Sequence, residues 1–424
     1  MIINRRSTLM GLGGAALWTV AAPGLAWARV ETDRRFLFIF LRGGMDGLSA
    51  VPAYGDPDFA AQRGVLGDPA PGAGSKFDTL KLDGFFGLHR DLTSMQALYQ
   101  DGELLPIHAV CHDYRDRSHF DAQDAFDRGS VDKGVKTGWL NRTLQSLPTA
   151  YTSGRTDVGM GLGPTLSMAL RGDVSVASWS PPQAPKADPD TLARLSKLYA
   201  SDKRLGPVLQ KGFAAQSMGE AMGGGSGGNM MGMGGSTGFG NAIQFQEYVK
   251  AAATFLNAPD GPRVVTIDFG NWDSHANQNQ QAERGPNNGN YGGQFAEMYL
   301  GLDKGIAALK AQMTPDAWSK TAVLMVTEFG RTVSINGTNG TDHGTGGACF
   351  LLGGAVKGGR VIADWPGLKR ANLRDERDLK PTTDLRSVAK AVLREHMGVS
   401  DASLATQIFP NSGGARPLEG LIRL

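Results

Sequence analysis

The stretch Thr321-Ala-Val-Leu-Met-Val-Thr-Glu-Phe-Gly-Arg-Thr332, with Gly340-Thr-Asp-His-Gly-Thr-Gly-Gly-Ala-Cys-Phe-Leu-Leu-Gly-Gly354 shortly after it, indicates how this 424-residue chain folds. Its apolar beginning predicts a buried parallel strand that reaches Glu328, and its apolar end predicts a second strand. A glycine-rich loop with Asp342 and His343 joins the two. Carboxylates and imidazoles at the carboxyl end of such strands are where an open α/β sheet holds its chemistry. We therefore expect a functional site here, with glycines beside His343 that let the backbone approach an ion or anion closely.

Apolar runs alternate with amphipathic segments along the rest of the chain, which is typical of a parallel α/β fold. We predict a doubly wound, mostly parallel sheet with helices on both faces. Predicted strands are Phe36–Leu41, Leu104–Val110 and Arg263–Ile267, and predicted helices, whose apolar residues recur every three or four positions, are 92–98, 295–309 and 385–393.

The amino terminus has the order of regions found in export signals. An Arg5-Arg6 pair precedes a mildly apolar segment, residues 11–25, and the small-x-small cleavage site Ala26-Trp27-Ala28 follows. Paired arginines specify the twin-arginine (Tat) route. The apolar run is shorter than the roughly 20 residues that a span needs. We expect residues 1–28 to be a Tat signal peptide handled by the Tat translocase, no stable membrane span after cleavage, and a periplasmic or secreted mature protein.

The mature chain, residues 29–424, is long enough for one elaborate α/β domain. Residues 215–240 are nearly all Gly, Ser and Met and predict a flexible insertion. Its methionines are soft donors for Cu(I), although no histidine or cysteine accompanies them, which favours a plain loop. A net charge of +2 gives no reason to expect a nucleic acid partner. We expect Cys111 and Cys349 to be two buried free thiols, and a single disulfide between them is the alternative.

Residues of ligand type gather after the apolar runs, and we expect them to converge on one site. Four of the seven histidines, His112, His119, His275 and His343, lie within two residues of an aspartate in loop-like sequence. Mixed carboxylates and imidazoles suit Zn, Mn or Fe, whereas all-oxygen sites suit Ca and Mg. Each cluster alone is equally compatible with an ordinary loop. The clusters are Asp46 after the first strand, His112–Asp121, Asp268–His275, and Glu328 with Asp342-His343.

Ser118 is open to two interpretations. With Asp121 three residues later it has the spacing of a helix capping pair, which is a structural role. A hydroxyl at a helix amino terminus is also well placed to attack phosphorus or sulfur, because the positive helix end stabilises an anionic substrate. Arg115, Arg117 or Arg331 can hold the remaining anionic oxygens by bidentate contacts.

Six motifs together resemble a Tat-exported family of unknown function, numbered 1501, that is placed in the alkaline phosphatase and sulfatase superfamily. The motifs are Leu-Arg-Gly-Gly-Met-Asp-Gly, Ser-His-Phe-Asp-Ala-Gln-Asp, Gly-Trp-Leu-Asn-Arg, Trp-Asp-Ser-His-Ala-Asn-Gln, Thr-Glu-Phe-Gly-Arg-Thr and Thr-Asp-His-Gly-Thr-Gly-Gly. The similarity covers nearly the whole mature chain. It implies an alkaline phosphatase-like α/β core, a nucleophile at a helix start and one or two divalent metal ions (Zn, Mn, Ca or Mg).

The resemblance also implies roles for single residues. By its pattern Asp46 is the first-strand ligand and Ser118 the nucleophile, Asp273 and His275 share one metal, Glu328 binds the other, and His343 is the last histidine. Two departures suggest that one metal position is weak or empty. Asp273 and His275 are separated by one residue rather than three, and Glu328-Phe329 replaces an Asp-His pair. If Asp342-His343 is that pair, no histidine follows it except His396, which is expected to be a helix-capping or surface residue.

The sequence therefore predicts an exported, metal-dependent hydrolase of small anionic phosphate or sulfate esters. The alternative is a non-catalytic periplasmic binding or assembly protein on the same scaffold. A sulfatase with formylglycine at Cys111 is disfavoured, because Asp113 stands where that pattern needs proline. The candidate metal ligands are Asp46, Asp273, His275, Glu328, Asp342 and His343, and the candidate catalytic residues are Ser118, His119, Arg115 and Arg331.

Overall fold

The computed structural model describes residues 33–148, 151, 158–181, 189–207, 209–210, 238–278 and 293–423. The expected signal peptide and nearly all of the Gly/Met-rich insertion lie outside these residues. No helix within the described part is long and apolar enough to cross a membrane.

An eight-stranded sheet forms the centre, in the order β10-β4-β9-β8-β1-β7-β5-β6. Only β9 runs antiparallel to its neighbours β4 and β8, and the other pairings are parallel. The predicted mostly parallel sheet is confirmed. The strands are β1 (Arg35–Leu41), β4 (Leu104–Cys111), β5 (Gly159–Leu162), β6 (Ala177–Trp179), β7 (Val264–Phe269), β8 (Thr321–Val326), β9 (Gly347–Leu352) and β10 (Thr383–Asp384).

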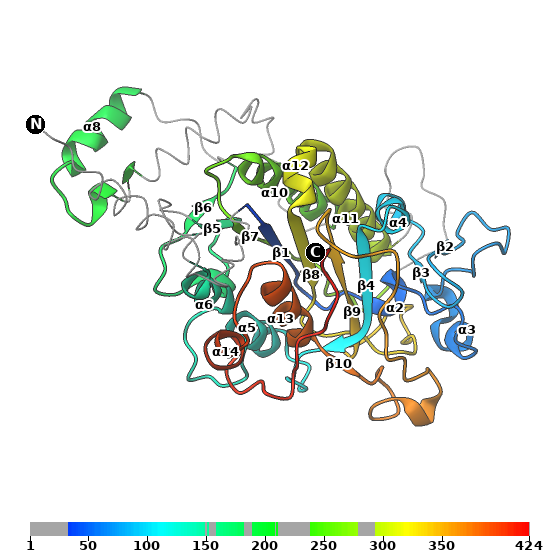
Figure 1. Ribbon diagram of the computed structural model, residues 1–424. Helices are drawn as coiled ribbons and strands as arrows, with labels where there is room; N and C mark the ends of the chain where they lie inside the picture. The colour runs from blue at the N-terminus through cyan, green and yellow to red at the C-terminus, as the bar shows by residue number, and fades with distance from the viewer. Residues whose placement is uncertain are drawn as a thin grey trace, which may run out of the picture. The chain divides into compact units, whose positions relative to one another are not determined.

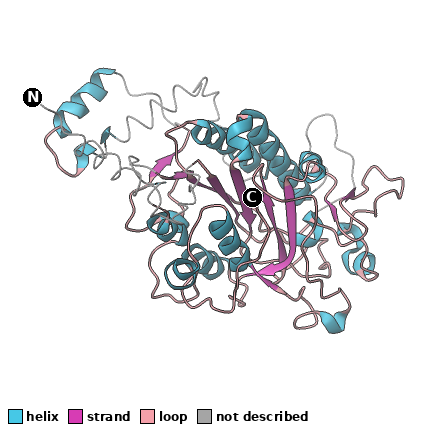
Figure 2. Cartoon of the chain, in the orientation of Figure 1, coloured by secondary structure: helices cyan, strands magenta, loops and turns pink. Residues whose placement is uncertain are grey.

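Helices cover both faces of this sheet (Figures 1 and 2). Strand β1 shows why, since its alternate side chains enter two separate cores. Leu37 and Ile39 pack with α4 (Thr93–Gln100), α10 (Gly238–Asn257) and α11 (Gly293–Gln312). Phe36 and Phe38 pack with α5 (His119–Arg128), α6 (Trp139–Ser146) and α13 (Leu385–Glu395).

Several smaller α-helices and one two-stranded sheet lie outside this framework. They are α2 (Gly47–Ala50), α3 (Phe59–Arg63), α8 (Pro189–Tyr199), α12 (Pro315–Ser319), α14 (Asp401–Ser403) and the antiparallel pair β2 (Leu80–Lys81) and β3 (Gly87–Leu88).

The predicted strands and helices are confirmed, and the structure adds detail at their ends. β8 ends at Val326, so Glu328 lies in the loop beyond it. His396 caps α13, which confirms the first of the two expected positions. Its ring is buried, and Nε2 lies 2.9 Å from the carbonyl oxygen of Arg35. Cys111 and Cys349 are both buried and free, which confirms the favoured interpretation.

Candidate metal centre

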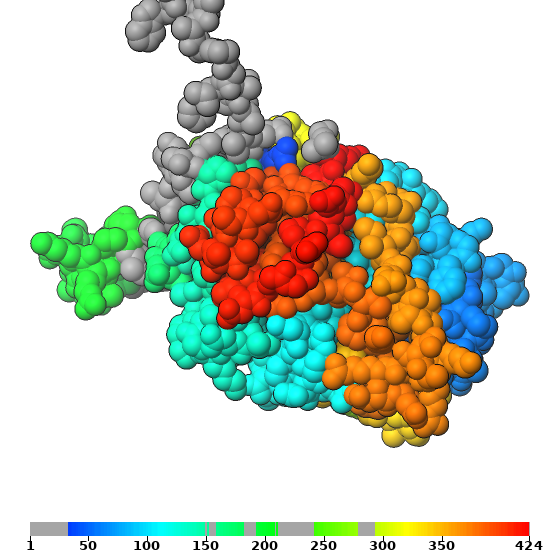
Figure 3. Space-filling model, turned by 60° about the horizontal axis from the view of Figure 1, so that its bottom comes forward, coloured from blue at the N-terminus to red at the C-terminus, as the bar shows by residue number. Residues whose placement is uncertain are grey.

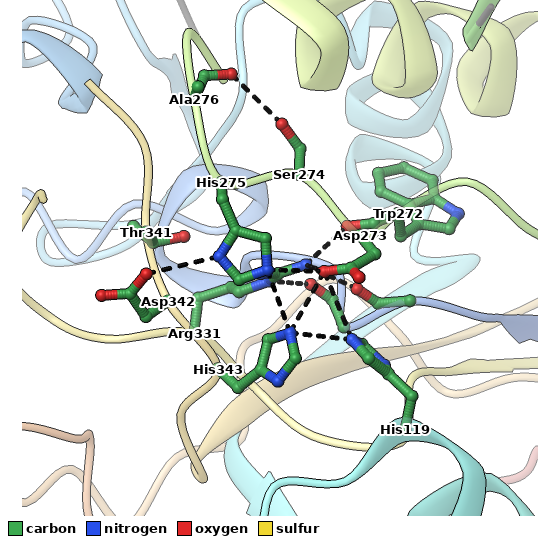
Figure 4. Close-up of polar contacts among 12 residues, drawn as sticks. His119, Trp272, Asp273, Ser274, His275, Ala276, Arg331, Thr341, Asp342 and His343 are labelled. Atoms are coloured by element: carbon green, nitrogen blue, oxygen red, sulfur yellow. Dashed lines mark hydrogen bonds and ion pairs between the residues drawn. The ribbon is translucent and has the colours of Figure 1, made fainter. Parts of the chain in front are cut away.

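Three histidines and one aspartate converge at the carboxyl ends of β7 and β8 (Figure 4). Nε2 of His119 lies 2.9 Å from Nε2 of His343, and Oδ1 of Asp273 lies 3.3 and 3.2 Å from those two atoms. Nε2 of His275 lies 3.1 Å from Nε2 of His343 and 3.0 Å from Oδ1 of Asp273. We call these four residues the His/Asp cluster.

The other ring nitrogen of each histidine meets an oxygen. Nδ1 of His119 lies 2.6 Å from Oε1 of Glu328. Nδ1 of His343 lies 3.0 Å from the carbonyl oxygen of Arg117. Nδ1 of His275 lies 3.3 Å from Oδ1 of Asp342. A carbonyl or carboxylate oxygen only accepts hydrogen bonds, so these contacts place a proton on Nδ1. In a neutral ring, Nε2 then carries a lone pair that faces the centre.

The Nε2 lone pairs of the neutral rings therefore face one another, and no Nε2 atom carries a proton that it could donate to its neighbour. Imidazole nitrogens facing each other at 2.9 and 3.1 Å, beside a carboxylate, repel unless a cation or an added proton lies among them. A tetrahedral site with bonds of about 2.0–2.1 Å has ligand atoms about 3.3 Å apart, close to the spacing here. The residues thus fit a divalent metal ion, held by imidazole nitrogens with orienting partners on their far side.

Four loops or helix starts from distant parts of the sequence build the cluster. His119 is the first residue of α5, which follows β4. Asp273 and His275 lie in the loop after β7, and His343 lies in the loop before β9. Because the carboxyl ends of parallel strands meet at one edge of a sheet, these segments come together there.

Charges around the cluster favour a bound cation. Burial raises the pKa of Asp273, but the hydrogen bond and charge of Arg331 outweigh it and bring that pKa to about 2. Burial lowers the pKa of His119, yet the bond and charge of Glu328 leave it above the ordinary value. Burial and the neighbouring His119 lower the pKa of His343. A carboxylate that stays ionised and an imidazole that attracts positive charge thus share the centre.

The backbone beside the cluster is constrained. Arg117 has φ of 61° and Asn271 has φ of 74°, a region that non-glycine residues rarely adopt and that is enriched at functional sites. A side chain at Gly340 or Gly344 would clash with the backbone of His275 or Arg331, respectively. The glycines around His343 therefore permit close contact between backbone segments.

Three of the expected ligands converge, namely Asp273, His275 and His343. His119, expected in the catalytic set, supplies the remaining donor. Within the described residues, one group of at least three His, Cys, Asp or Glu donors is compact enough for a metal, formed by His119, Asp273 and His343. His275 lies beside this group, with Nε2 near His343 and Asp273. The structure thus offers one metal position in its described part where the resemblance allowed two.

Asp46 lies outside the cluster. Its carboxylate caps α2 by accepting from the backbone N–H of Leu48 at 3.1 Å and from Ser49 at 2.7 Å, and it forms a buried ion pair with Arg63. Both oxygens are therefore engaged in structural contacts, and the structure does not bear out a role for Asp46 as a ligand in this centre.

Three other expected site residues orient the cluster instead of joining it. Glu328 is fully buried and accepts from His119, from the backbone N–H of Gly43 at 2.8 Å and from Gln123 at 2.8 Å. Asp342 orients His275. Arg331 is buried, donates to Oδ1 of Asp273 at 2.9 Å and binds the carbonyls of the Gly43-Gly44 turn, so it does not face a substrate as expected.

Ser118 and Arg115 make other contacts. Ser118 is the residue before α5, but its side chain makes no capping bond, and Oγ lies 3.4 Å from Oδ2 of Asp121. Arg115 donates to the carbonyl of Tyr114 at 3.0 Å and lies 3.5 Å from the Cys111 sulfur. His112, buried against Phe126, takes no part in the cluster.

Sequence reasoning missed two features. Gln123, one turn after His119 on α5, holds Glu328, and Arg117 orients His343 through a carbonyl group that leaves no trace in residue type. The helical spacing of His119 and Gln123 was the available signal for the first.

The fold and the site together define an α/β protein with a histidine-carboxylate centre at the carboxyl edge of its sheet. The chain belongs to the family described as protein of unknown function (DUF1501), which matches residues 94–409. The family expected from the six motifs is confirmed. A search of curated proteins finds no match to this sequence.

The chain also resembles several solved structures weakly. The C-terminal periplasmic domain of EptC from Escherichia coli, in complex with Zn, is 12% identical with a TM-score of 0.36 and coverage of 78% of this chain and 77% of that chain. A protein in the alkaline phosphatase superfamily from Vibrio parahaemolyticus is 10% identical, with a TM-score of 0.37 and coverage of 78% and 63%. The lipoteichoic acid synthase LtaP from Listeria monocytogenes is 10% identical, with a TM-score of 0.38 and coverage of 89% and 76%.

Proposed function

We propose that this protein is an exported, metal-dependent hydrolase of phosphate or sulfate esters. The observation that carries the proposal is the convergence of the His119, His275 and His343 Nε2 atoms and Asp273 Oδ1 within 2.9–3.3 Å along the measured pairs. Imidazole nitrogens combined with a carboxylate oxygen suit Zn, Mn or Fe, whereas Ca and Mg prefer oxygen ligands alone. Export by the Tat route remains part of the proposal and rests on residues 1–28.

A bound divalent ion supplies Lewis acidity to a phosphoryl or sulfuryl oxygen. The protein itself contributes orientation. Glu328, Asp342 and the Arg117 carbonyl hold the three rings with Nε2 toward the centre, and Arg331 holds Asp273. The cluster stays accessible, because the side chains of His275 and Asp273 are 45% and 46% exposed. Solvent therefore reaches the cluster at these two side chains.

Ser118 is the proposed nucleophile. It immediately precedes His119 and sits at the positive end of α5, where anionic ester oxygens are stabilised. Its hydroxyl bonds to Asp121 rather than to an atom of the cluster, so attack requires rotation about its Cα–Cβ bond. Water is the competing nucleophile.

The test is a screen of phosphate and sulfate mono- and diesters with the purified mature chain, loaded in turn with Zn, Mn or Fe. Ser118→Ala and His343→Ala proteins are assayed beside it. Turnover that disappears in His343→Ala supports the hydrolase. Absence of any difference between the wild-type and His343→Ala proteins across the panel contradicts it.

A second candidate function is a non-catalytic metal-binding protein. The observation in its favour is the position of His275, whose Nε2 lies 3.1 Å from Nε2 of His343 and 3.0 Å from Oδ1 of Asp273. As a fourth protein ligand it would close a tetrahedral site, whereas catalytic sites keep an open position. His275→Ala separates the two candidates. Removing the most exposed histidine of the cluster leaves three ligands, so a structural site loses stability, whereas a catalytic site with three core ligands retains its metal.

A further inference from the structure

A groove of about 800 Å³ lies between the loop after β4 and the segment 366–382. Figure 3 shows this segment, in orange, at the surface beside the cyan residues of that loop region. The volume is in the range of sites that hold ligands much larger than a single phosphate ion. The residues that line it are Arg115, Pro366, Ala371, Asn372, Leu373, Arg374, Asp375, Lys380, Pro381 and Thr382.

The charge of the groove is positive. Arg115, Arg374 and Lys380 line it, and Asp375 is its only acidic lining residue. That carboxylate is bound by Arg117 from outside the lining, at 2.8 Å, which cancels most of its effect. The structure gives no acidic partner, among the described residues, for Arg115 or Lys380, and Arg374 has only a 3.5 Å contact with Asp375. Three cationic groups are thus available to a ligand.

The wall of the groove also supports the His/Asp cluster. Arg117 binds Asp375 and Asp378 through its side chain, and its carbonyl accepts from Nδ1 of His343. Arg377 donates to the carbonyl oxygen of His343 at 2.8 Å. The groove and the centre therefore share two supporting segments, the loop after β4 and residues 374–378.

We propose that the groove binds an oligoanion, a flexible molecule with several phosphate or sulfate groups along its length, through Arg115, Arg374 and Lys380. This inference adds a substrate class to the proposed function. It rests on that function in one point, namely that one ester of the bound molecule reaches the His/Asp cluster. Spaced cations on a rigid wall select spaced anions, because each guanidinium or ammonium group forms charge-assisted hydrogen bonds with one of them.

Binding is tested by calorimetry on the full mature chain, with and without the divalent ion. Inorganic tripolyphosphate and a sulfated tetrasaccharide are the probes, which distinguishes a phosphate chain from a sulfated glycan, and an uncharged maltotetraose is the control. The variant is Arg115→Gln/Lys380→Gln. Its matched control is Lys357→Gln, because Lys357 is an exposed lysine that does not line the groove.

The expected result is binding of at least one charged probe, a loss of affinity of about tenfold or more in the double variant, and less than twofold in Lys357→Gln. Equal affinity of the wild type and the double variant overturns the proposal, as does equal binding of the uncharged sugar. Binding is measured with and without metal, so it is independent of turnover. A protein that binds an oligoanion in the groove but hydrolyses no ester would support this inference and contradict the proposed hydrolase. Hydrolysis of small esters without any oligoanion binding would support the hydrolase and overturn the proposed oligoanion site.

Discussion

Oε1 of the buried Glu328 lies 2.6 Å from Nδ1 of His119, and this contact sets the direction in which the imidazole offers its other nitrogen. A carboxylate behind a histidine ligand orients the ring and raises its basicity. Burial alone would raise the pKa of Glu328, but its bonds with His119 and Gln123 hold it below the ordinary value. The negative charge is therefore maintained beneath the centre.

Glu328→Gln should weaken metal binding by about 10- to 100-fold, the usual cost of losing such an orienting partner. The amide keeps the size of the side chain and removes its charge. Metal affinity is measured by competition with a chelator. Glu103→Gln is the control, because it alters a carboxylate bonded to Lys310 and Trp318 before β4, at the other end of the sheet. Equal losses in the two variants would show that the effect is not specific to the centre.

His343→Ala should reduce bound metal well below the wild-type stoichiometry and abolish the rise in melting temperature on adding metal. The rise follows from binding to the folded state alone. The expected orientation of His343, with its second nitrogen on a carboxylate or carbonyl, is confirmed by the Arg117 contact. Asp121→Asn is the control, since Asp121 lies on the same helix as His119 and outside the cluster. Wild-type metal content in His343→Ala would mean that this histidine only shapes its loop.

Ser118→Ala should lower turnover by at least about a thousandfold if the hydroxyl is the nucleophile, because a covalent step is then lost. Metal content should remain at the wild-type value, since Ser118 makes no contact with the cluster atoms. The two quantities are measured on the same preparation. Near-normal turnover would assign the attack to water and leave the metal centre unaffected.

The central strands were predictable because a strand buried on both faces has a continuous apolar run. The long helices were predictable because a helix buried on one face repeats apolar residues every three or four positions. Asp273, His275 and His343 were also accessible, because polar residues follow apolar strands there. The structural role of Asp46 could not be predicted, because its ion pair with Arg63 forms only when the chain folds. Arg331 and Glu328 were misplaced for a similar reason. Residue type does not reveal whether a charged side chain touches an ion or a neighbour that holds the ion's ligand.

Stability should fall between pH 6.5 and 4, partly through His108 and His396. Burial lowers both pKa values to about 4, so the unfolded chain binds protons on these rings in that range while the folded chain does not. Their stabilising contribution is present above pH 6.5 and is lost as the pH falls toward 4, at up to about 1.4 kcal/mol per pH unit for each ring. Asp127, whose pKa burial raises to about 7, acts in the opposite direction.

His396→Gln isolates one of these contributions. Denaturant unfolding from pH 7 to 4.5 should give a shallower decline than in the wild type, by about 1.4 kcal/mol per pH unit at most. Asp127 is present in both proteins, so its effect cancels in the comparison. Parallel curves for the two proteins would show that His396 is not held neutral in the fold.

The most direct test of the metal centre is X-ray absorption of the purified mature chain, combined with elemental analysis. The proposed function predicts one divalent Zn, Mn or Fe ion per chain, bound by imidazole nitrogen and carboxylate oxygen atoms at about 2.0–2.2 Å. Asp273→Asn should change the oxygen contribution and leave the imidazole signal. A protein that holds no metal, and whose melting temperature is unchanged by Zn, Mn or Fe, would contradict the account.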